Sequence, residues 1–321
     1  MNIFATSSEF GCNSRTAIEE FLKPLEIKIH YNTNRGPLSE KDFLKIEPVY
    51  DAIIAYSSHD IVTPEVLDHF PELKIVARHG IGYDSIDVKA ANERGVTVTN
   101  THEGAHEERA VSDLAMTFIL ALARDLVNIS NSVKSGKWDR PITQDLYGKT
   151  IGIIGTGRIG KMTALKAKAL GMKIIAYDVY HDNKFAEENQ IVYVTFERLL
   201  QESDFISLHC PFTEDNQHMI GAKEIAMMKP ESILVNCARG ALVDETALYE
   251  ALKSGKIGGA GIDVFQKEPP VNNPLLSLPN VLATSHLGAY TKETITAMDL
   301  LVVKACADVL LGKCPSNIVK A

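Results

Sequence analysis

The segment that decides the fold is "TIGIIGTGRIGKMTALKAKALGMKIIAYD", residues 150–178. A short apolar run leads into Gly155-x-Gly157-x-x-Gly160, and a helical pattern and a second apolar run follow, ending at Tyr177 and Asp178. In a strand–helix–strand unit such glycines permit a tight turn, the approach of a pyrophosphate to backbone amides, and close helix–strand packing. The helix N-terminus adds partial positive charge for the anion. The segment therefore predicts a dinucleotide-binding unit.

Asp178 indicates which dinucleotide this unit binds. It lies at the distance beyond the last glycine at which a carboxylate accepts hydrogen bonds from both ribose hydroxyls. Its charge would repel a 2′-phosphate, and the next three residues offer no arginine or lysine. We therefore expect NAD rather than NADP. The cofactor contacts predicted from this segment are Gly155, Gly157, Arg158, Ile159, Gly160, Tyr177 and Asp178.

The same alternation of apolar runs and amphipathic segments extends in both directions. Residues 2–6, 26–32, 50–57, 73–78 and 96–100 have the pattern of strands, and a second series runs from residue 149 to about 289. This order predicts an α/β fold with two Rossmann-like doubly wound parallel-sheet domains and a cleft between them. We expect a discontinuous substrate domain from residues 1–99 and 290–321, and an NAD-binding domain from residues 100–289. One long helix is predicted from about Glu107 to Ser135, and another after Tyr290.

Composition limits the classes of partner. The chain has 321 residues, 45% of them hydrophobic and 23% charged, and a formal net charge of −8. These values are typical of a globular protein and argue against nucleic acid or an anionic membrane as a partner. The five cysteines are scattered without metal-ligand spacing, which suits a reducing cytoplasm. The N-terminus lacks a signal-peptide pattern, and the longest apolar stretch, residues 110–123, is too short to span a bilayer. We expect a cytoplasmic protein without a bound metal.

Three polar side chains follow predicted strands of the second series and are candidates for catalysis. Arg239 follows "ILVNCA", Glu268 follows "AGIDVFQK", and His286 follows "NVLATS". In an open α/β sheet, residues after the C-terminal ends of strands line the ligand-binding edge. A histidine can donate a proton near neutral pH, a carboxylate can fix its tautomer, and an arginine can hold a substrate carboxylate. Each residue taken alone could instead be structural, as an ion-pair arginine, a turn glutamate or a capping histidine.

Five motifs in order strengthen these assignments. "IGIIGTGRIG", "LHCPFTEDNQHMI", "NCARGALVDETAL", "GIDVFQKEPP" and "SHLGAYTKE" together resemble the D-isomer-specific 2-hydroxyacid dehydrogenases, with phosphoglycerate dehydrogenases nearest in motifs. The resemblance implies that Arg239 holds the substrate carboxylate and carbonyl oxygen, that Glu268 supports His286, and that His286 is the acid/base and borders the cofactor. It also places Asp263 by the nicotinamide amide and Cys210-Pro211 by the adenosine. The remaining predicted cofactor contacts are Cys237, Ala238 and Gly288.

The loop "ARHGIGYDS", residues 77–85, is the predicted substrate-binding segment. Gly80 and Ile81 resemble the family's substrate loop, whose backbone amides bind the carboxylate. Arg78 matches an arginine that lies near the phosphate in phosphoglycerate enzymes. His79 stands where a small residue is common, and we expect it to contact the substrate. Histidines that follow nearby could suggest a metal cluster, but the implied reaction needs no metal.

The implied activity is that of an NAD-dependent oxidoreductase interconverting a small anionic D-2-hydroxy acid and its 2-keto acid by hydride transfer. The first candidate is 3-phosphoglycerate/3-phosphohydroxypyruvate, and a glyoxylate, hydroxypyruvate or other 2-keto acid reductase is the alternative. An NAD(H)-sensing binding protein, similar to corepressors of this fold, is an alternative from another class. We also expect a homodimer that pairs through the long helix near Ala110–Val127, and no regulatory domain after Ala321.

Overall fold

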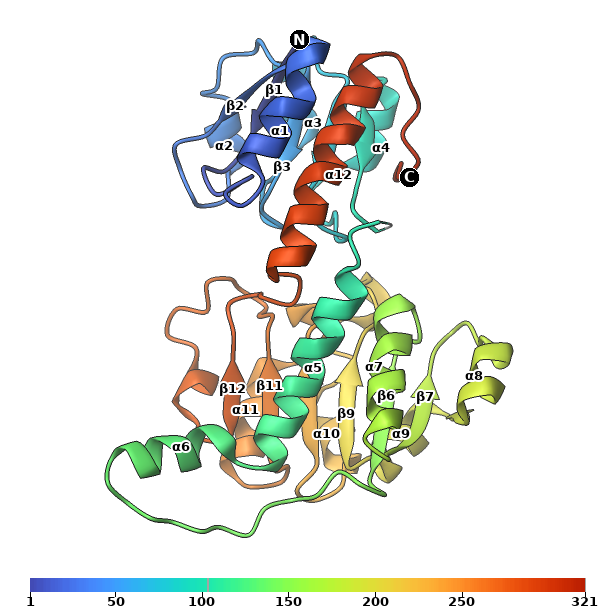
Figure 1. The fold of residues 1–321 in the computed structure, drawn as a ribbon. Coiled ribbons are helices and arrows are strands. Elements are labelled where there is room, and N and C mark those ends of the chain that lie inside the picture. Colours follow the sequence, from blue (N-terminus) through green and yellow to red (C-terminus); the bar gives the residue numbers. More distant parts are fainter. Residues whose placement is uncertain (103, 321) are drawn as a thin grey trace. The chain divides into compact units, whose positions relative to one another are not determined.

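The computed structural model describes residues 1–102 and 104–320. The chain forms two compact units (Figure 1): Met1–His106 with Ala289–Ala321 makes the first, and Glu107–Gly288 makes the second. The first unit continues past residue 99 because the residues that follow bond within it. Asn100 N donates to Asn317 O at 3.3 Å, and Thr101 N donates to Gly80 O at 3.2 Å. In sequence, the second unit is an insertion within the first.

A five-stranded parallel sheet, in the order β2-β1-β3-β4-β5, forms the centre of the first unit. Its strands are β1 (Asn2–Ala5), β2 (Lys28–Tyr31), β3 (Ala52–Ala55), β4 (Ile75–Arg78) and β5 (Thr97–Thr99). Its α-helices are α1 (Arg15–Leu22), α2 (Glu40–Phe43), α3 (Pro64–His69), α4 (Val88–Glu93) and α12 (Lys292–Leu310), and a short 3₁₀ helix is η1 (Lys23–Leu25). The order of a doubly wound sheet puts the switch point between β1 and β3.

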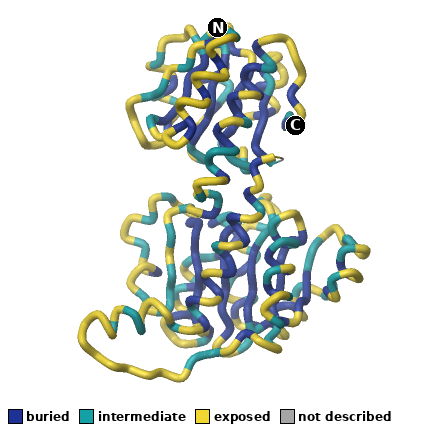
Figure 2. The backbone as a smooth tube through the Cα atoms, viewed as in Figure 1, coloured by how far each residue is buried: buried dark blue, intermediate teal, exposed yellow. Residues whose placement is uncertain are grey.

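Side chains of this sheet alternate between two covered faces, because successive residues of a strand point to opposite sides. Ile54 packs on one face with residues of α1 and α12, such as Val302. Ile53 packs on the other face with residues of α3 and α4. Whole strands such as Ala52–Ala55 are therefore buried, as Figure 2 shows.

A seven-stranded parallel sheet, in the order β12-β11-β10-β9-β6-β7-β8, forms the centre of the second unit. Its strands are β6 (Thr150–Ile154), β7 (Lys173–Tyr177), β8 (Ile191–Tyr193), β9 (Phe205–Leu208), β10 (Ile233–Asn236), β11 (Gly259–Ile262) and β12 (Val281–Ala283). Its α-helices are α5 (Glu107–Ala123), α6 (Leu126–Lys134), α7 (Arg158–Ala169), α8 (Asn183–Asn189), α9 (Phe196–Glu202), α10 (Ala222–Met227) and α11 (Glu245–Lys253). Its 3₁₀ helices are η2 (Glu214–Asn216), η3 (Gly240–Leu242) and η4 (Pro274–Ser277).

The strand order of the second sheet reverses between β6 and β9. Open α/β sheets bind ligands beside such a switch point, at the C-terminal ends of the strands. The helices cover both faces: α5 and α7 lie on one, and α9, α10 and α11 lie on the other. The prediction of an α/β class with two doubly wound parallel sheets is confirmed.

The prediction of a single helix from Glu107 to Ser135 is wrong, because the structure divides this segment into α5 and α6. The break lies at Asp125, which takes a left-handed conformation with φ 47°. Gln144 N donates to Ala123 O at 2.9 Å and satisfies a carbonyl at the end of α5. Figure 1 shows α5 against the sheet, whereas α6 has no buried residue.

None of the helices in residues 1–102 and 104–320 is long and apolar enough to cross a membrane. Nor do three His, Cys, Asp or Glu side chains gather in these residues in a way that could hold a metal ion.

Candidate active site

The predicted site residues of the second unit lie along one edge of its sheet. All strands there are parallel, so their C-terminal ends meet at the same edge. In strand order the edge carries His286 after β12, Asp263 and Glu268 after β11, Cys237–Arg239 after β10, Cys210-Pro211 after β9, Gly155–Gly160 after β6 and Asp178 after β7. The catalytic candidates thus follow three neighbouring strands, and the dinucleotide motif follows strands next along the same edge.

The three glycines after β6 differ in what their surroundings would allow at each position. Gly155 has φ 91°, and a Cβ there would lie 2.6 Å from the backbone nitrogen of Cys210. A Cβ on Gly160 would lie 1.9 Å from the Gly155 carbonyl oxygen. Gly157 differs, because its φ of −66° suits any residue and a Cβ built there meets no atom of the described chain within 4 Å. The chain itself gives no reason for this glycine, and the open space above it fits an approaching ligand.

The first turn of α7 borders this space. Gly157 is the N-cap and no side chain caps the helix, so its first amides are available to an anion. Arg158 is exposed, and its Nη2 lies 2.6 Å from Glu108 Oε2 on α5. Ile159 packs against the core. The glycine turn and the uncapped helix together fit the pyrophosphate of a dinucleotide.

Asp178 is fixed by backbone and hydroxyl donors at the end of β7. Its Oδ2 accepts from Thr156 N at 2.5 Å and from Thr156 Oγ1 at 2.9 Å, and its Oδ1 accepts from Tyr180 N at 3.0 Å. Burial raises the pKa of this carboxyl, but the hydrogen bonds from Tyr180 and Thr156 together outweigh it and leave the pKa below its ordinary value. Asp178 is a carboxylate at neutral pH, as ribose recognition requires. Sequence reasoning missed Tyr193, whose hydroxyl lies 2.9 Å from that of Thr156.

The remaining predicted cofactor contacts lie at the same edge. Tyr177 and Ala238 are half-buried, and Pro211 is exposed. Burial raises the pKa of the Cys210 thiol to about 11 and that of Cys237 well above its ordinary value. Both cysteines are therefore neutral thiols, and they offer small apolar surfaces rather than nucleophiles.

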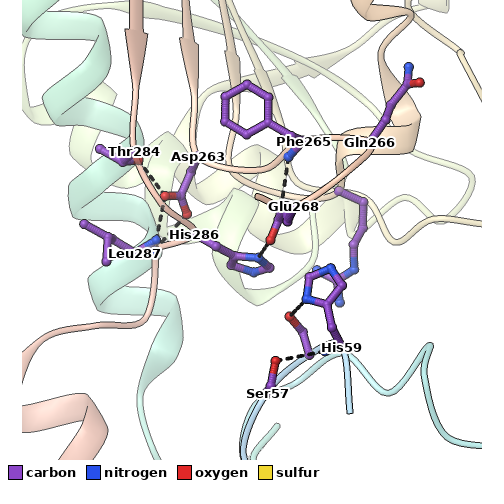
Figure 3. Close-up of polar contacts among 12 residues, drawn as sticks. Ser57, His59, Asp263, Phe265, Gln266, Glu268, Thr284, His286 and Leu287 are labelled. Carbon is purple, nitrogen blue, oxygen red and sulfur yellow. Dashed lines mark hydrogen bonds and ion pairs between the residues drawn. The ribbon is translucent and has the colours of Figure 1, made fainter. Parts of the chain in front are cut away.

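Glu268 and His286 form the central polar contact of the site (Figure 3). Glu268 Oε2 lies 2.9 Å from His286 Nδ1, and Glu268 Oε1 accepts from Phe265 N at 3.0 Å. A carboxylate on Nδ1 fixes the imidazole tautomer and leaves Nε2 to exchange a proton with a substrate. The His286 side chain is 35% exposed and that of Glu268 is 17% exposed. A ligand can reach the imidazole, whereas its carboxylate partner is largely shielded from water.

Asp263 holds the backbone on which His286 stands. Its Oδ1 accepts from Thr284 Oγ1 and from Leu287 N, both at 2.6 Å, and its Oδ2 accepts from Gly288 N at 2.8 Å (Figure 3). These bonds keep His286 in the left-handed region, at φ 58°, which costs a non-glycine residue about 1–3 kcal/mol. The sequence predicted cofactor contacts for Asp263 and Gly288. In the structure they first support the turn that presents His286.

Arg239 follows β10 in an extended conformation and is half-buried. Its Nη1 donates to Ala238 O at 2.8 Å, which fixes the side chain beside its own backbone. A Cβ on Gly240 would lie 2.0 Å from the carbonyl carbon of Phe265, so this turn packs directly on the segment that leads to Glu268. The structure therefore joins the Arg239 turn to the Glu268 loop. The planar guanidinium can bind paired carboxylate oxygens.

In the first unit, Arg78 lies beneath the predicted substrate loop instead of on its surface. It is buried, and its guanidinium donates to backbone carbonyls of the same unit: Nε to Gly82 at 2.9 Å, and Nη1 to Ala55 at 3.0 Å, to Tyr56 at 2.8 Å and to His79. Five donors on one planar group can link several carbonyls at once. Nε and Nη1 thus bond backbone carbonyls of the loop and of the end of β3, so the predicted phosphate contact gains no support from these atoms.

His79 also takes a position different from the predicted one. Its Nε2 lies 2.9 Å from Asp299 Oδ1 on α12, and Asp299 Oδ2 accepts from Ser14 Oγ at 2.6 Å. Burial lowers the pKa of His79 despite the opposing effect of Asp299, which keeps the imidazole neutral at pH 7. The ring also contacts Phe10 and Tyr56. In the structure His79 belongs to the core of the first unit, since it is 4% exposed and bonded to α12, so these contacts add no support to the predicted substrate contact.

Gly80 and Ile81 form the turn above Arg78. The Gly80 carbonyl accepts from Thr101 N at 3.2 Å, and the Ile81 carbonyl accepts from Asn100 Nδ2 at 2.8 Å. Within the described chain, the N–H groups of Ile81 and Gly82 have no protein acceptor. The turn can therefore offer two amide donors to a ligand. Sequence reasoning missed Asn100, because nothing in its neighbourhood indicates the loop that it holds.

Known proteins resemble the chain in both sequence and structure. Residues 116–288 match the family model described as "D-isomer specific 2-hydroxyacid dehydrogenase, NAD binding domain". The chain is 44% identical over 278 residues to the D-3-phosphoglycerate dehydrogenase of Methanocaldococcus jannaschii. This match covers 85% of the present chain and 53% of the relative. The chain is also 45% identical over 294 residues to the glyoxylate reductase of Thermococcus litoralis. That match covers 89% of the present chain and 86% of the relative.

The structure is similar to that of D-lactate dehydrogenase from Aquifex aeolicus complexed with NAD and lactic acid. The TM-score is 0.87 at 30% identity, over 99% of each chain. In length, the chain spans about half of the phosphoglycerate dehydrogenase relative and most of the glyoxylate reductase relative.

Proposed function

We propose, because the chain belongs to the D-isomer specific 2-hydroxyacid dehydrogenase family, that it is an NAD-dependent oxidoreductase interconverting a small D-2-hydroxy acid and its 2-keto acid. The contact between Glu268 and His286, on the sheet edge that also carries the glycine turn, is the observation that carries this proposal. A glycine turn alone would suit many nicotinamide proteins. The acid/base pair adds the chemistry that a hydroxy acid requires.

His286 exchanges the proton with the substrate oxygen. When bound, the nicotinamide ring supplies or accepts the hydride at the substrate carbon. In reduction, Nε2 of the imidazolium donates its proton to the keto oxygen, and in oxidation neutral Nε2 removes the hydroxyl proton. Glu268 on Nδ1 orients the ring and stabilises its positive charge. Such general acid–base catalysis contributes about 10²- to 10⁴-fold in rate.

An anion-binding group of the second unit supports an acidic substrate. We assign to Arg239 the substrate carboxylate and carbonyl oxygen, since a half-buried guanidinium can bind two oxygens at once. In the first unit, the N–H groups of Ile81 and Gly82 are the donors offered to a carboxylate. Asp178 and the first turn of α7 hold the cofactor at its ribose and pyrophosphate.

The substrate best supported is a small 2-keto acid without a terminal phosphate, such as glyoxylate or hydroxypyruvate. The sequence placed 3-phosphohydroxypyruvate first because phosphoglycerate dehydrogenases are nearest in motifs and because of Arg78. Nε and Nη1 of that arginine, however, donate to carbonyls of its own unit. The match over most of a glyoxylate reductase also favours this order. The phosphorylated acid is the second candidate.

Initial rates measured by NADH absorbance test the proposal. The panel contains glyoxylate, hydroxypyruvate and 3-phosphohydroxypyruvate, each with NADH and with NADPH. We expect turnover that prefers NADH, with a higher kcat/KM for the two unphosphorylated acids. Preference for the phosphorylated acid would reverse the order of substrates. Tight NADH binding without turnover of any 2-keto acid would instead favour the NAD(H)-sensing alternative.

We also propose a homodimer, paired through α6 and the segment that follows it. Figure 1 shows this segment extending away from the sheet of the second unit. Four of its large apolar residues expose more than half of their surface: Leu126 (59%), Trp138 (80%), Ile142 (102%) and Tyr147 (79%). Such a concentration marks a contact surface. The predicted pairing helix near Ala110–Val127 corresponds mostly to α5, much of which is buried in its own unit.

Two matched substitutions test the dimer. Ile142→Asp places a charge on the exposed segment, and Tyr180→Asp places one on an equally exposed apolar residue elsewhere in the unit. Sedimentation equilibrium should give the mass of two chains for the original protein and for Tyr180→Asp, and the mass of one chain for Ile142→Asp. A dimer unaffected by both changes would show that the pairing surface lies elsewhere.

A reducing, cytoplasmic location is the last part of the proposal. All five cysteines are free thiols, and Cys237 and Cys306 are buried. Free thiols persist where the surroundings keep them reduced.

A further inference from the structure

One carboxylate holds both ends of the loop that carries Glu268. This loop, residues 265–273, runs from the end of β11 to η4. Glu245, the first residue of α11, accepts from Gln266 N on Oε1 at 2.6 Å. It accepts from Asn273 Nδ2 on Oε2, also at 2.6 Å. Each oxygen of Glu245 therefore receives a donor from a different end of the loop.

The first end of the loop connects directly to the acid/base pair. Gln266 is held twice, since its Nε2 also donates to Val243 O at 2.7 Å. The preceding residue, Phe265, donates its N–H to Glu268 Oε1 at 3.0 Å, and Glu268 Oε2 meets His286 (Figure 3). A displacement of Gln266 would therefore be transmitted to the Glu268 carboxylate through adjacent backbone.

We propose that Glu245 is a positioning residue for the acid/base pair, which fixes the loop so that Glu268 stays within hydrogen-bonding distance of His286. The inference rests on the function proposed above, in which this pair transfers the proton. Glu245 contacts Gln266 and Asn273, not the reacting atoms, and acts only through Glu268.

The role requires an ionised carboxylate. Both partners of Glu245 are N–H donors, and only a carboxylate accepts on both oxygens, whereas an amide offers one acceptor and one donor group. In Glu245→Gln the new NH₂ would face either the N–H of Gln266 or the NH₂ of Asn273, so one of these two donors loses its acceptor. Asn273 cannot turn its oxygen towards the new NH₂ without losing the bond that its Oδ1 accepts from Leu275 N at 3.1 Å. Glu245→Gln thus keeps the shape of the side chain and releases one end of the loop.

The neighbouring residue, Asp244, provides a matched control. Its Oδ1 accepts from Thr246 N at 2.9 Å and from Ala247 N at 3.1 Å, so it caps α11. Asp244→Ala disturbs the same helix end and leaves the bonds from Glu245 to the loop in place. It therefore reproduces a loss of local stability without the proposed loss of positioning.

The experiment compares the original protein with Glu245→Gln, Asn273→Ala, Asp244→Ala and Glu268→Gln. For each we measure kcat for reduction of glyoxylate against pH, the NADH Kd, the Tm, and the downfield NMR resonance of the His286 ring proton that Glu268 accepts. Glu245→Gln should lower kcat about tenfold, less than Glu268→Gln does, with an unchanged NADH Kd. The alkaline limb of its kcat profile should move to lower pH, because a loosened Glu268 stabilises the imidazolium less.

The controls separate positioning from stability. Asn273→Ala should move the limb in the same direction as Glu245→Gln, and the two changes combined should add little. Asp244→Ala should lower the Tm and leave the limb and the NMR resonance in place. A Glu245→Gln protein that loses Tm but keeps both the limb and the resonance would overturn the inference.

Failure of the proposed function gives a different result. If the original protein reduces no 2-keto acid, the proposed reaction is refuted, and the NMR resonance still decides whether Glu245 positions the pair. If Glu268→Gln leaves the limb unchanged while the original protein is active, the role of Glu268 is refuted, and the inference falls with it.

Discussion

Two carboxylates hold His286, one at its ring and the other at the backbone that follows it. Glu268 contacts its ring at Nδ1, and Asp263 binds the backbone N–H groups of the next two residues. The first contact sets the protonation chemistry, and the second sets the direction in which the imidazole points. A left-handed residue without such support would relax to an ordinary conformation. Both the ring and the backbone of His286 are therefore held by side chains of the β11 end.

Replacing the imidazole tests the acid/base role. His286→Ala should lower kcat about 10²- to 10⁴-fold, because no other group then transfers the proton. The NADH Kd should change by less than about twofold, since in the proposed mechanism the imidazole serves the substrate oxygen. Stopped-flow single turnovers measure the chemical step, and fluorescence titration measures the Kd. Turnover within a few-fold of the original would show that another residue is the proton donor.

Replacing the ribose carboxylate tests cofactor selection. Asp178→Ala should raise the NADH Kd about tenfold and lower the NADPH Kd, because hydrogen bonds to the ribose and repulsion of a 2′-phosphate are both lost. Asp182→Ala is the control, since this nearby carboxylate pairs with Lys161 Nζ at 2.5 Å. Fluorescence titration with both dinucleotides gives the ratio. A ratio that Asp178→Ala leaves unchanged would contradict the assigned role.

At the residue scale, motif order predicted that Glu268 supports His286, and the structure brings the two side chains into contact, whereas the partners of Arg78 and His79 were not predicted. Ligand contacts were predicted for Arg78 and His79 because the loop of residues 77–85 resembles the family's substrate loop. Their partners come from elsewhere in the fold: carbonyls of β3 and its following residue for Arg78, and Asp299 of α12 for His79. A sequence pattern contains no information on partners so far apart in the chain. Asn100 escaped prediction for the same reason.

At the scale of helices and strands, two glycines of the turn after β6 allow close packing between neighbouring elements. Gly155 lets β6 approach the end of β9, and Gly160 lets α7 approach the turn itself. Both glycines serve the packing of the protein. Gly157 is required neither by its backbone conformation nor by packing. The turn therefore contains two glycines that folding requires and one that fits ligand binding.

Two alanine substitutions separate these requirements. Gly160→Ala should prevent folding or lower the Tm strongly, because its Cβ would lie 1.9 Å from a carbonyl oxygen. Gly157→Ala should keep the original Tm within a few degrees and raise the NADH Kd about tenfold or more, because the methyl group enters the ligand space. Calorimetry and fluorescence titration give the two quantities. Unchanged NADH binding in a folded Gly157→Ala protein would remove the main reason for placing the pyrophosphate there.

At the element scale, the sequence predicted the long, strongly patterned elements and missed the weak ones. β8 is only three residues long, at the edge of its sheet, and only Ile191 in it is buried. The break between α5 and α6 carries no glycine or proline, and apolar residues continue on both sides of Asp125. There the tertiary structure overrides the local pattern.

The whole molecule contains two histidines whose burial links its stability to pH. Burial lowers the pKa of His209 to about 3, and burial also lowers the pKa of His79 against the opposing effect of Asp299. In the unfolded chain a histidine has a pKa of about 6.5. Below that value the unfolded state binds protons that the folded state does not, so the free energy of unfolding must decrease as the pH falls.

Urea unfolding at several pH values measures this linkage. From about pH 7.5 to about pH 5.5, His209 should lower the free energy of unfolding by about 1.4 kcal/mol, and His79 should lower it further in the same direction. Changing His209 to Gln should remove its share of the pH dependence, whatever it does to stability at neutral pH. A free energy of unfolding that stays level or increases across this interval would show that the two rings are protonated in the folded protein.

The insertion of one unit within the other decides the order in which the parts can be completed on the ribosome. Val302 of α12 covers apolar residues of β1 and β3, yet it is translated after the whole of Glu107–Gly288. At about 5–20 residues per second, the part of this sheet face that α12 covers stays exposed for roughly 10–40 s, with only α1 packed beside it. The contiguous nucleotide-binding part can finish during that interval. The unit whose residues leave the ribosome first is thus the last to complete its core.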